Sequence, residues 1–163
     1  LQVALNLENE DLTLYRRFGY GTSAFSEGWA LYSERLALEA GLAEDPYDEM
    51  GVLQSELFRA VRLVVDTGMH YKRWTREEAI TYMKDITGMS DTEVRVEIER
   101  YIVWPGQACS YKMGMLKILE LREKAKEQQK ENFNIKDFHS IVLEQGQPPL
   151  FIVEELVSEM IEN

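Results

Sequence analysis

Apolar residues recur at helical spacing along nearly the whole chain, and the strict alternation that is typical of strands is scarce. The pattern predicts an all-α fold, a single multi-helix domain over residues 1–163 with no internal repeat and no low-complexity linker. In the first part of the chain, the predicted helices are the tail of a helix over 1–7, a short helix over 8–17, a helix around Glu27 that ends near Ala40, and a helix over 46–70. Two further helices are predicted to begin at Thr75 and Ser90. The last three are a helix from Pro105-Gly106 to about Gln129, a short helix from Asn134 to Gln145, and a helix over 150–162.

Local end signals support several of these boundaries. Asp45 before Pro46 is a typical helix start, with aspartate at the cap and proline at the first helical position. Thr75 with Glu78 and Ser90 with Glu93 have the spacing of capping boxes. These starts are therefore encoded within a few residues of each helix.

Two carboxylates stand out on the helix that contains Phe25. Glu27 and Glu34 lie seven residues apart, so two helical turns bring them to nearly the same direction. The neighbouring side chains are mostly apolar, and a buried carboxylate is costly unless a cation, a metal or hydrogen-bond donors compensate it. The pattern therefore requires a positive partner for this pair.

A second polar stripe interrupts the most apolar predicted helix. Arg59, Arg62, Asp66 and His70 fall within an arc of about 80° at 100° per residue. One interpretation is a polar cavity, and the other is an internal ion-pair network in which the arginines hold acidic side chains of the chain itself. Asp66 and His70 also have a spacing that two metal ligands can use, although it is common, and a lone histidine is more often structural.

A third polar pair follows the Pro105-Gly106 break. Gln107 and Tyr111 lie one turn apart, and Gly114 continues the same face. Small residues there suit either the approach of a ligand to the backbone or close helix packing. Cys109 has no basic activator nearby in sequence, so thiol catalysis is not expected.

Composition and charge exclude several classes. With 18 basic and 29 acidic residues the net charge is −11, which argues against nucleic-acid binding and against docking to anionic lipid. One cysteine rules out an internal disulfide, and no apolar run is long enough for membrane insertion. The chain begins without methionine, so we expect it to be a piece of a longer protein, from the cell envelope or the cytoplasm.

Several separate motifs resemble the bacterial "domain of unknown function 885" family, whose members look like zinc metallopeptidases. The match runs nearly end to end, and the motifs follow one another in the expected order. They are Phe25 to Glu34, Arg59 to His70, Arg100-Tyr101, Pro105 to Tyr111, and Phe138-His139 with Gly146 to Leu150.

The resemblance implies that this chain is the C-terminal portion of a helical zinc-peptidase-like fold. The family's histidine ligands and catalytic glutamate would precede Leu1, so zinc is expected only with those missing histidines. Glu27 is then the expected third zinc ligand, and Glu34 and Asp66 are expected to support the metal ligands without binding zinc.

The resemblance also implies roles for the remaining polar residues. Tyr101 and His70 are the expected catalytic residues, as donors to the oxyanion of a hydrolysed peptide or amide bond. A peptide-like substrate would be held by Arg59, Arg62, Gln107 and Tyr111.

Two non-enzymatic alternatives stay open for the chain alone, which lacks the His-Glu motif. One is a helical module that binds a peptide or a protein, and the other is a structural lobe with self-paired charges. Loss of an upstream helix would expose apolar surface around Phe25, Trp29 and Leu31, so association with the missing N-terminal part, or self-association, is expected.

Overall fold

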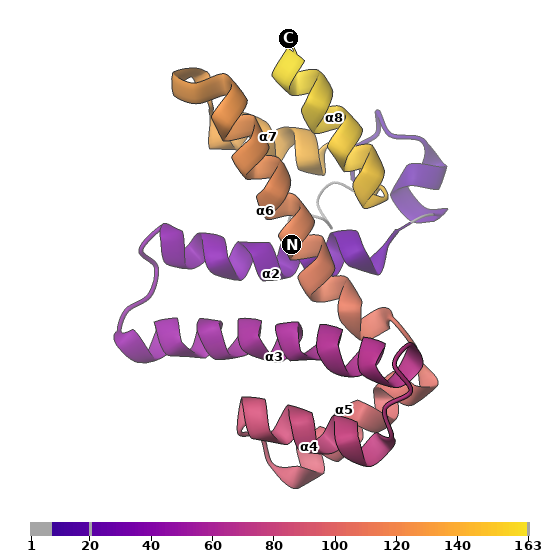
Figure 1. The fold of residues 1–163 in the computed structure, drawn as a ribbon. Helices are drawn as coiled ribbons and strands as arrows, with labels where there is room; N and C mark the ends of the chain where they lie inside the picture. Colours follow the sequence, from indigo (N-terminus) through magenta and orange to yellow (C-terminus); the bar gives the residue numbers. More distant parts are fainter. Residues whose placement is uncertain (1–7, 20, 163) are drawn as a thin grey trace. The chain divides into compact units, whose positions relative to one another are not determined.

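A computed structural model describes residues 8–19 and 21–162, and within them every regular element is helical (Figure 1). The all-α fold is therefore confirmed for these residues. The elements are a π-helical turn η1 (Tyr15–Gly19), helices α2 (Ser23–Glu39), α3 (Pro46–His70), α4 (Arg76–Thr87) and α5 (Asp91–Val103), a 3₁₀ turn η2 (Gln107–Cys109), α6 (Ser110–Gln129), a 3₁₀ turn η3 (Lys130–Asn132), α7 (Ile135–Leu143) and α8 (Leu150–Glu162).

The predicted helix starts are confirmed where their signals are local. The Asp45 side chain accepts hydrogen bonds from the backbone N–H groups of Tyr47 and Asp48, and the Asp48 side chain closes a capping box. The predicted boxes at Thr75 and Ser90 are both present. Each box satisfies backbone N–H groups that a helix start otherwise leaves unpaired.

The predicted helix over 8–17 is wrong. Two backbone donors there go to side chains: the Asp11 N–H donates to Asn9 Oδ1 at 3.0 Å, and the Arg16 N–H donates to Thr13 Oγ1 at 3.4 Å. Such local bonds compete with helix formation, and only the π-helical turn η1 follows. The predicted helix over 1–7 lies outside the described residues.

The helix expected from Pro105-Gly106 begins later than predicted. Gly106 adopts a left-handed conformation with φ of 78°, which suits glycine and interrupts the helix. The chain then passes through η2 before α6 begins at Ser110 and ends, as expected, at Gln129.

The contacts divide the chain into two compact units. Unit 1 holds the residues up to Tyr32 and those from Met113 onward, and unit 2 is Ser33–Lys112. Helices α2 and α6 contribute to both. The prediction of one domain stays a prediction, and each unit is described here by itself.

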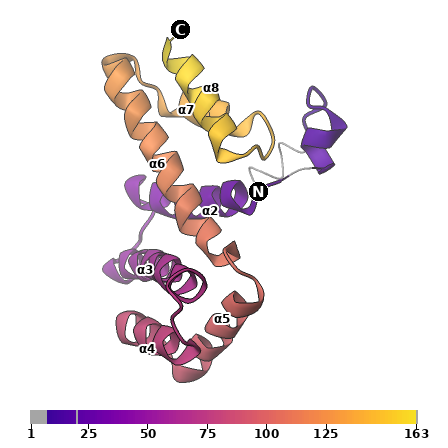
Figure 2. The same ribbon diagram turned by 45° about the vertical axis from the view of Figure 1, so that its right-hand side comes forward.

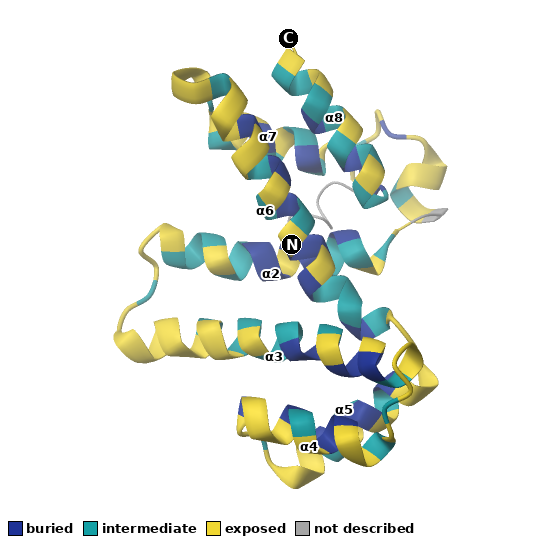
Figure 3. Cartoon of the chain, viewed as in Figure 1, coloured by how far each residue is buried: buried dark blue, intermediate teal, exposed yellow. Residues whose placement is uncertain are grey.

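In unit 2 the second half of α3 packs against α4, α5 and η2, as Figures 1 and 2 show. The core has Val61 and Val65 from α3, and the first half of α3 is largely exposed in Figure 3. The other buried core members are Ala79, Ile80, Met83, Val94, Ile98, Tyr101 and Ala108.

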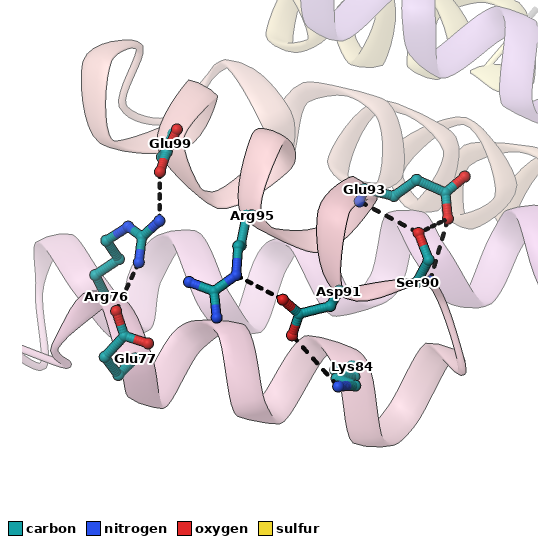
Figure 4. Close-up of polar contacts among 8 residues, drawn as sticks. All are labelled: Arg76, Glu77, Lys84, Ser90, Asp91, Glu93, Arg95 and Glu99. Atoms are coloured by element: carbon teal, nitrogen blue, oxygen red, sulfur yellow. Dashed lines mark hydrogen bonds and ion pairs between the residues drawn. The ribbon is translucent and has the colours of Figure 1, made fainter.

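Ion pairs tie α4 to α5 at the surface of unit 2 (Figure 4). Arg76 pairs with Glu77 and reaches across to Glu99. Asp91 at the start of α5 binds both Lys84 and Arg95. Because these pairs are exposed, they add little to stability.

In unit 1 the backbones of α2 and α6 meet at two glycines. A Cβ atom on Gly28 would lie 2.5 Å from the Cα of Gly114, and one on Gly114 would lie 1.8 Å from the carbonyl oxygen of Ala24. Only hydrogen fits at these positions, because real Cβ atoms do not approach other atoms so closely. The interpretation of Gly114 as a site of tight helix packing is confirmed.

An aromatic cluster fills the space beside this contact. His139 on α7 stands edge-on to Trp29, with ring centroids 5.3 Å apart, and its Nε2 lies 2.8 Å from the hydroxyl of Tyr32. Burial, followed by the nearby charge of Arg122, lowers the pKa of His139. His139 is therefore a packed, hydrogen-bonded residue of unit 1.

Candidate functional site

The polar centre of unit 2 joins α3 to α5 through a buried arginine. The Arg62 Nε donates to the Tyr101 hydroxyl at 3.0 Å, and its Nη2 donates to Glu97 Oε2 at 3.0 Å. The Tyr101 hydroxyl in turn donates to Glu97. The three side chains form a closed triangle in which every member has a partner.

Aromatic rings complete the surroundings of Arg62. Its guanidinium carbon lies 4.2 Å from the centroid of Phe58 and 5.0 Å from that of Tyr111. Both separations are within the range of cation–π attraction. The positive charge of Arg62 is thus satisfied by one carboxylate and by ring faces, all within unit 2.

Tyr101 has the properties of a structural phenol in this arrangement. Its side chain is fully buried. Burial is the main cause that raises its pKa well above the ordinary value of 10, and the hydrogen bond to Glu97 adds to the effect. Donation to a substrate oxyanion would require the hydroxyl to exchange Glu97 for the substrate.

Asp66 and His70 hold the backbone around the left-handed turn. Both carboxylate oxygens of Asp66 accept from the Gly106 N–H, at 3.1 and 3.0 Å, and the Asp66 side chain is buried. The His70 Nε2 lies 3.0 Å from the carbonyl oxygen of Tyr101. The two residues, whose spacing two metal ligands can use, thus bind different backbone groups.

Gln107 and Arg100 form a hydrogen bond beside the same turn. Arg100 Nη2 donates to Gln107 Oε1 at 2.6 Å, and Arg100 Nη1 lies 3.6 Å from Glu97 Oε1. Burial raises the pKa of the adjacent Cys109 thiol to about 11, with a further contribution from Asp66. A thiol with this pKa is a poor nucleophile at neutral pH.

Arg59 and Glu34 are joined through a serine. Ser55 Oγ donates to Glu34 Oε2 at 3.0 Å, and Arg59 Nη1 donates to Ser55 Oγ at 2.5 Å and to the Ser55 carbonyl at 3.2 Å. Arg59 Nε is buried and has no hydrogen-bond partner among the described residues. Of the two arginines on the polar stripe, Arg59 is the one with an unused donor.

Glu27 lies in unit 1, on the turn of α2 that contacts α6. Its side chain is half-buried and forms no ion pair or hydrogen bond with any residue that the structure describes. The adjacent Gly28 fixes the helix at this level against Gly114. Glu27 is thus a carboxylate on a rigid helix with its acceptor capacity unused.

The described residues do not form a zinc site by themselves. Within residues 8–19 and 21–162, no three His, Cys, Asp or Glu side chains come close enough together to hold a metal ion. His70 and His139 each use Nε2 in a hydrogen bond within their own unit. Glu27 therefore fits zinc only as one ligand among others supplied from elsewhere, and we assign no reaction step to this chain alone.

Two small cavities lie apart from most of the predicted residues. One, of about 280 Å³, is in unit 2 beside the Arg59–Ser55 pair and is lined by Gly51, Gln54, Ser55, Phe58, Thr87 and Met89. The other, of about 210 Å³, is in unit 1 and is lined by Tyr15, Arg16, Gln145, Gln147, Pro148, Pro149 and Ile152. Neither is lined by any of the residues proposed from sequence as catalytic, substrate-binding or metal-binding.

Sequence reasoning missed two acidic residues that organise unit 2. Glu97 joins Arg62 to Tyr101, and Glu56 binds Lys112 and lies 3.7 Å from Arg35. The spacing of Glu97 one turn before Tyr101 was a usable signal, because residues four apart on a helix are neighbours. An ion-pair network, one of the two interpretations of the polar stripe, is present, and the partner of Arg62 in it is Glu97.

The expected apolar surface around Phe25 is also absent from the described structure. Phe25, Trp29 and Leu31 are all buried within it. Among the described residues no helix is both long and apolar enough to cross a bilayer.

Fold and site together define a class: an all-α protein in which ionisable side chains are paired between helices. The chain belongs to the DUF885 family, described as bacterial protein of unknown function, which matches residues 1–157. No curated protein matches the chain.

A solved structure with the same fold is the crystal structure of the "putative lipoprotein from Colwellia psychrerythraea". The two chains share 52% sequence identity with a TM-score of 0.94. The match covers 99% of this chain and 28% of that one, so this chain spans less than a third of the length of its relative.

Proposed function

We propose that this chain is the C-terminal portion of a zinc-dependent, peptidase-like hydrolase, inactive by itself, which supplies one metal ligand and the substrate-facing helices. The longer relative supports the first part of the proposal, because a segment that spans 28% of a chain is compatible with a site completed elsewhere. Zinc held by two histidines and a carboxylate would provide a Lewis acid for attack of water on an amide carbonyl.

Glu27 carries the proposal. A half-buried carboxylate without a protein partner is partly removed from water, which favours a compensating group. A metal ion is such a group, and Glu27 is held on a helix whose position the Gly28–Gly114 contact fixes. Glu34, in contrast, already accepts a hydrogen bond from Ser55, which agrees with a supporting role.

Arg59 is the favoured contact for the substrate. Its Nε is buried without a partner, and Ser55, to which Arg59 donates, lines a cavity of about 280 Å³. Rotation of the Arg59 side chain toward this cavity would let it bind a peptide carbonyl or a terminal carboxylate. Arg62 and Tyr111 are in contact with each other. In this proposal Arg62, Gln107 and Tyr111 shape the site, while Arg59 binds.

The proposed catalytic roles of Tyr101 and His70 depend on a change of hydrogen bonds. Tyr101 must leave Glu97, and His70 must leave the carbonyl oxygen of Tyr101, before either can serve an oxyanion. Unchanged turnover of the longer protein after Tyr101→Phe would remove Tyr101 from the mechanism.

Zinc content tests the proposal directly. A chain extended upstream of Leu1 would be measured by elemental analysis beside its Glu27→Gln variant, with Glu39→Gln, at an exposed position of the same helix, as the matched control. We expect about one zinc per chain in the parent and in the control, and loss of the metal in Glu27→Gln. Retention of zinc by Glu27→Gln would overturn the ligand assignment.

A helical peptide-binding module is the second candidate, favoured by the buried unpaired donor of Arg59 beside a cavity. Absence of tightly bound zinc from every extended chain would overturn the hydrolase in favour of this module. Calorimetric titration with a short peptide, compared between the parent and Arg59→Lys, then measures whether the module recognises a carboxylate, because lysine cannot form the same fork of donors.

A further inference from the structure

Helix α3 carries an apolar stripe that faces outward, with three members in its first half and Val64 in its second half. Met50, Leu53, Leu57 and Val64 are 61%, 55%, 41% and 38% exposed. At 100° per residue they fall within an arc of about 60°, so they form one straight ridge along the helix. Figure 3 shows the corresponding half of α3 as mostly exposed.

The packing of unit 2 covers this ridge only in part. Helices α4 and α5 and the turn η2 pack against the adjoining side of α3, where Val61 and Val65 enter the core, and Met50, Leu53, Leu57 and Val64 stay exposed beside it. Surface apolar residues scattered singly need no explanation, but a continuous row at helical spacing indicates a surface that something covers. A ridge of residues three, four and seven apart fits the groove of a second helix.

The size of the stripe argues against a second copy of the chain as its cover. A stable interface between two separate chains buries about 800 Å² per partner, more than four partly exposed side chains provide. A helix of the same polypeptide can cover a smaller surface, because it does not lose the translational and rotational freedom of a separate molecule. The related solved chain extends far beyond the matched region, since this chain covers 28% of it.

We propose that the Met50–Leu53–Leu57–Val64 ridge of α3 is the docking surface for an amphipathic helix of the same polypeptide, in the part that precedes Leu1. The exposed Glu49 at the border of the ridge favours a basic residue on the edge of that helix. This inference rests on the part of the proposed function that makes the chain one portion of a longer protein, and it does not depend on zinc. It replaces Phe25, Trp29 and Leu31, which are buried, as the expected attachment surface.

Cysteine accessibility in the longer protein tests the docking surface. Leu57→Cys would be introduced beside Gly51→Cys, a matched control on the same half of α3, where an added Cβ meets open space. Both changes would be made with Cys109 replaced by alanine, and alkylation of the folded proteins by iodoacetamide would be followed by mass spectrometry. We expect Leu57→Cys to react at least about tenfold more slowly than the control at every protein concentration.

Two outcomes would overturn the proposal. Equal reaction rates at both positions would show that the ridge is open in the longer protein. Protection that disappears on dilution would assign the ridge to a second copy. If Leu57→Cys fails to fold, by loss of its helical circular dichroism, Val64→Cys on the same ridge provides the measurement. Zinc content is not read here, so failure of the metal proposal leaves this result unaffected.

Discussion

The two halves of α3 differ in which side chains they bury and which they expose. In the second half Arg62 and Asp66 are buried, and each polar group is matched to a partner on α5 or at the turn after it. In the first half apolar side chains face outward, and Arg59, just past the middle of the helix, keeps an unused donor. The second half therefore has the paired polar groups of a packed interior, whereas the first half has exposed apolar side chains.

This difference separates stability from function along a single element. Buried charges that satisfy each other specify how α3, α4 and α5 pack, and they leave little capacity for a ligand. Unused donors and exposed apolar rows have that capacity. Of the residues predicted for a site, Glu27 and Arg59 have an acceptor or a donor that is free to bind a ligand. Arg62, Asp66 and Tyr101 are already hydrogen-bonded within the chain.

The largest expected effect comes from removing the buried charge of Arg62 in the second half of α3. Arg62→Ala removes the buried cation that donates to both Glu97 and the Tyr101 hydroxyl and leaves Glu97 with Tyr101 and the more distant Arg100, so we expect a loss of about 3 kcal/mol in the free energy of unfolding. This is the lower end for a buried pair, because the Glu97 side chain is 19% exposed. Denaturant unfolding followed by circular dichroism measures it.

Arg59→Ala, one turn away, is the matched control for this change. It loses hydrogen bonds to Ser55 alone, so we expect a cost of at most about 1 kcal/mol. Equal losses for the two arginines would contradict the distinction between the halves of α3.

A smaller effect is expected at the start of the exposed half. Asp45→Ala removes the acceptor for the N–H groups of Tyr47 and Asp48, which should cost about 1 kcal/mol. Asp45→Asn keeps an acceptor and should restore most of the loss. A calorimetric midpoint that is the same for parent and alanine variant would show that the first turn of α3 contributes nothing.

The smallest expected effect is a pH dependence of the helices that cover the second half. Hydrogen bonds from the backbone and side chain of Thr75 lower the pKa of Glu78, and those from Ser90 lower the pKa of Glu93, both from an ordinary value of 4.5. A carboxylate with a lowered pKa stabilises the folded state above about pH 4.5, and the contribution disappears as the pH falls through the folded value.

Thermal midpoints between pH 6 and pH 3 measure this contribution. The parent should lose more stability over that range than a Glu78→Gln/Glu93→Gln double variant, which has no carboxylate to protonate at the two caps. Parallel curves for the two proteins would rule out a role of the capping boxes in acid sensitivity.

Local features of the fold were predictable from sequence, and tertiary ones were not. The capping boxes at Thr75 and Ser90 are encoded within four residues, and the 25-residue helix α3 was predicted with its observed ends. The helix predicted over 8–17 failed because the Asn9 and Thr13 side chains compete for backbone donors.

The site was harder to predict because its partners lie far apart in sequence. Periodicity places Arg62 and Asp66 on one face of a helix, but it does not say which helix that face meets. Glu97 became the partner of Arg62, and the Gly106 N–H became the partner of Asp66, through the packing of α5 and the turn after it.

The contact between Gly28 and Gly114 has a consequence for the order in which the chain acquires its structure. Unit 2 is continuous in sequence, whereas unit 1 is interrupted by the whole of unit 2. During synthesis from the N-terminus, unit 2 can therefore fold as soon as Lys112 has left the ribosome, while α2 waits for α6 to supply the glycine on which it rests. Until then Phe25 and Trp29 lack their cover, so the interval in which this chain is most prone to aggregate is set by the time needed to translate unit 2.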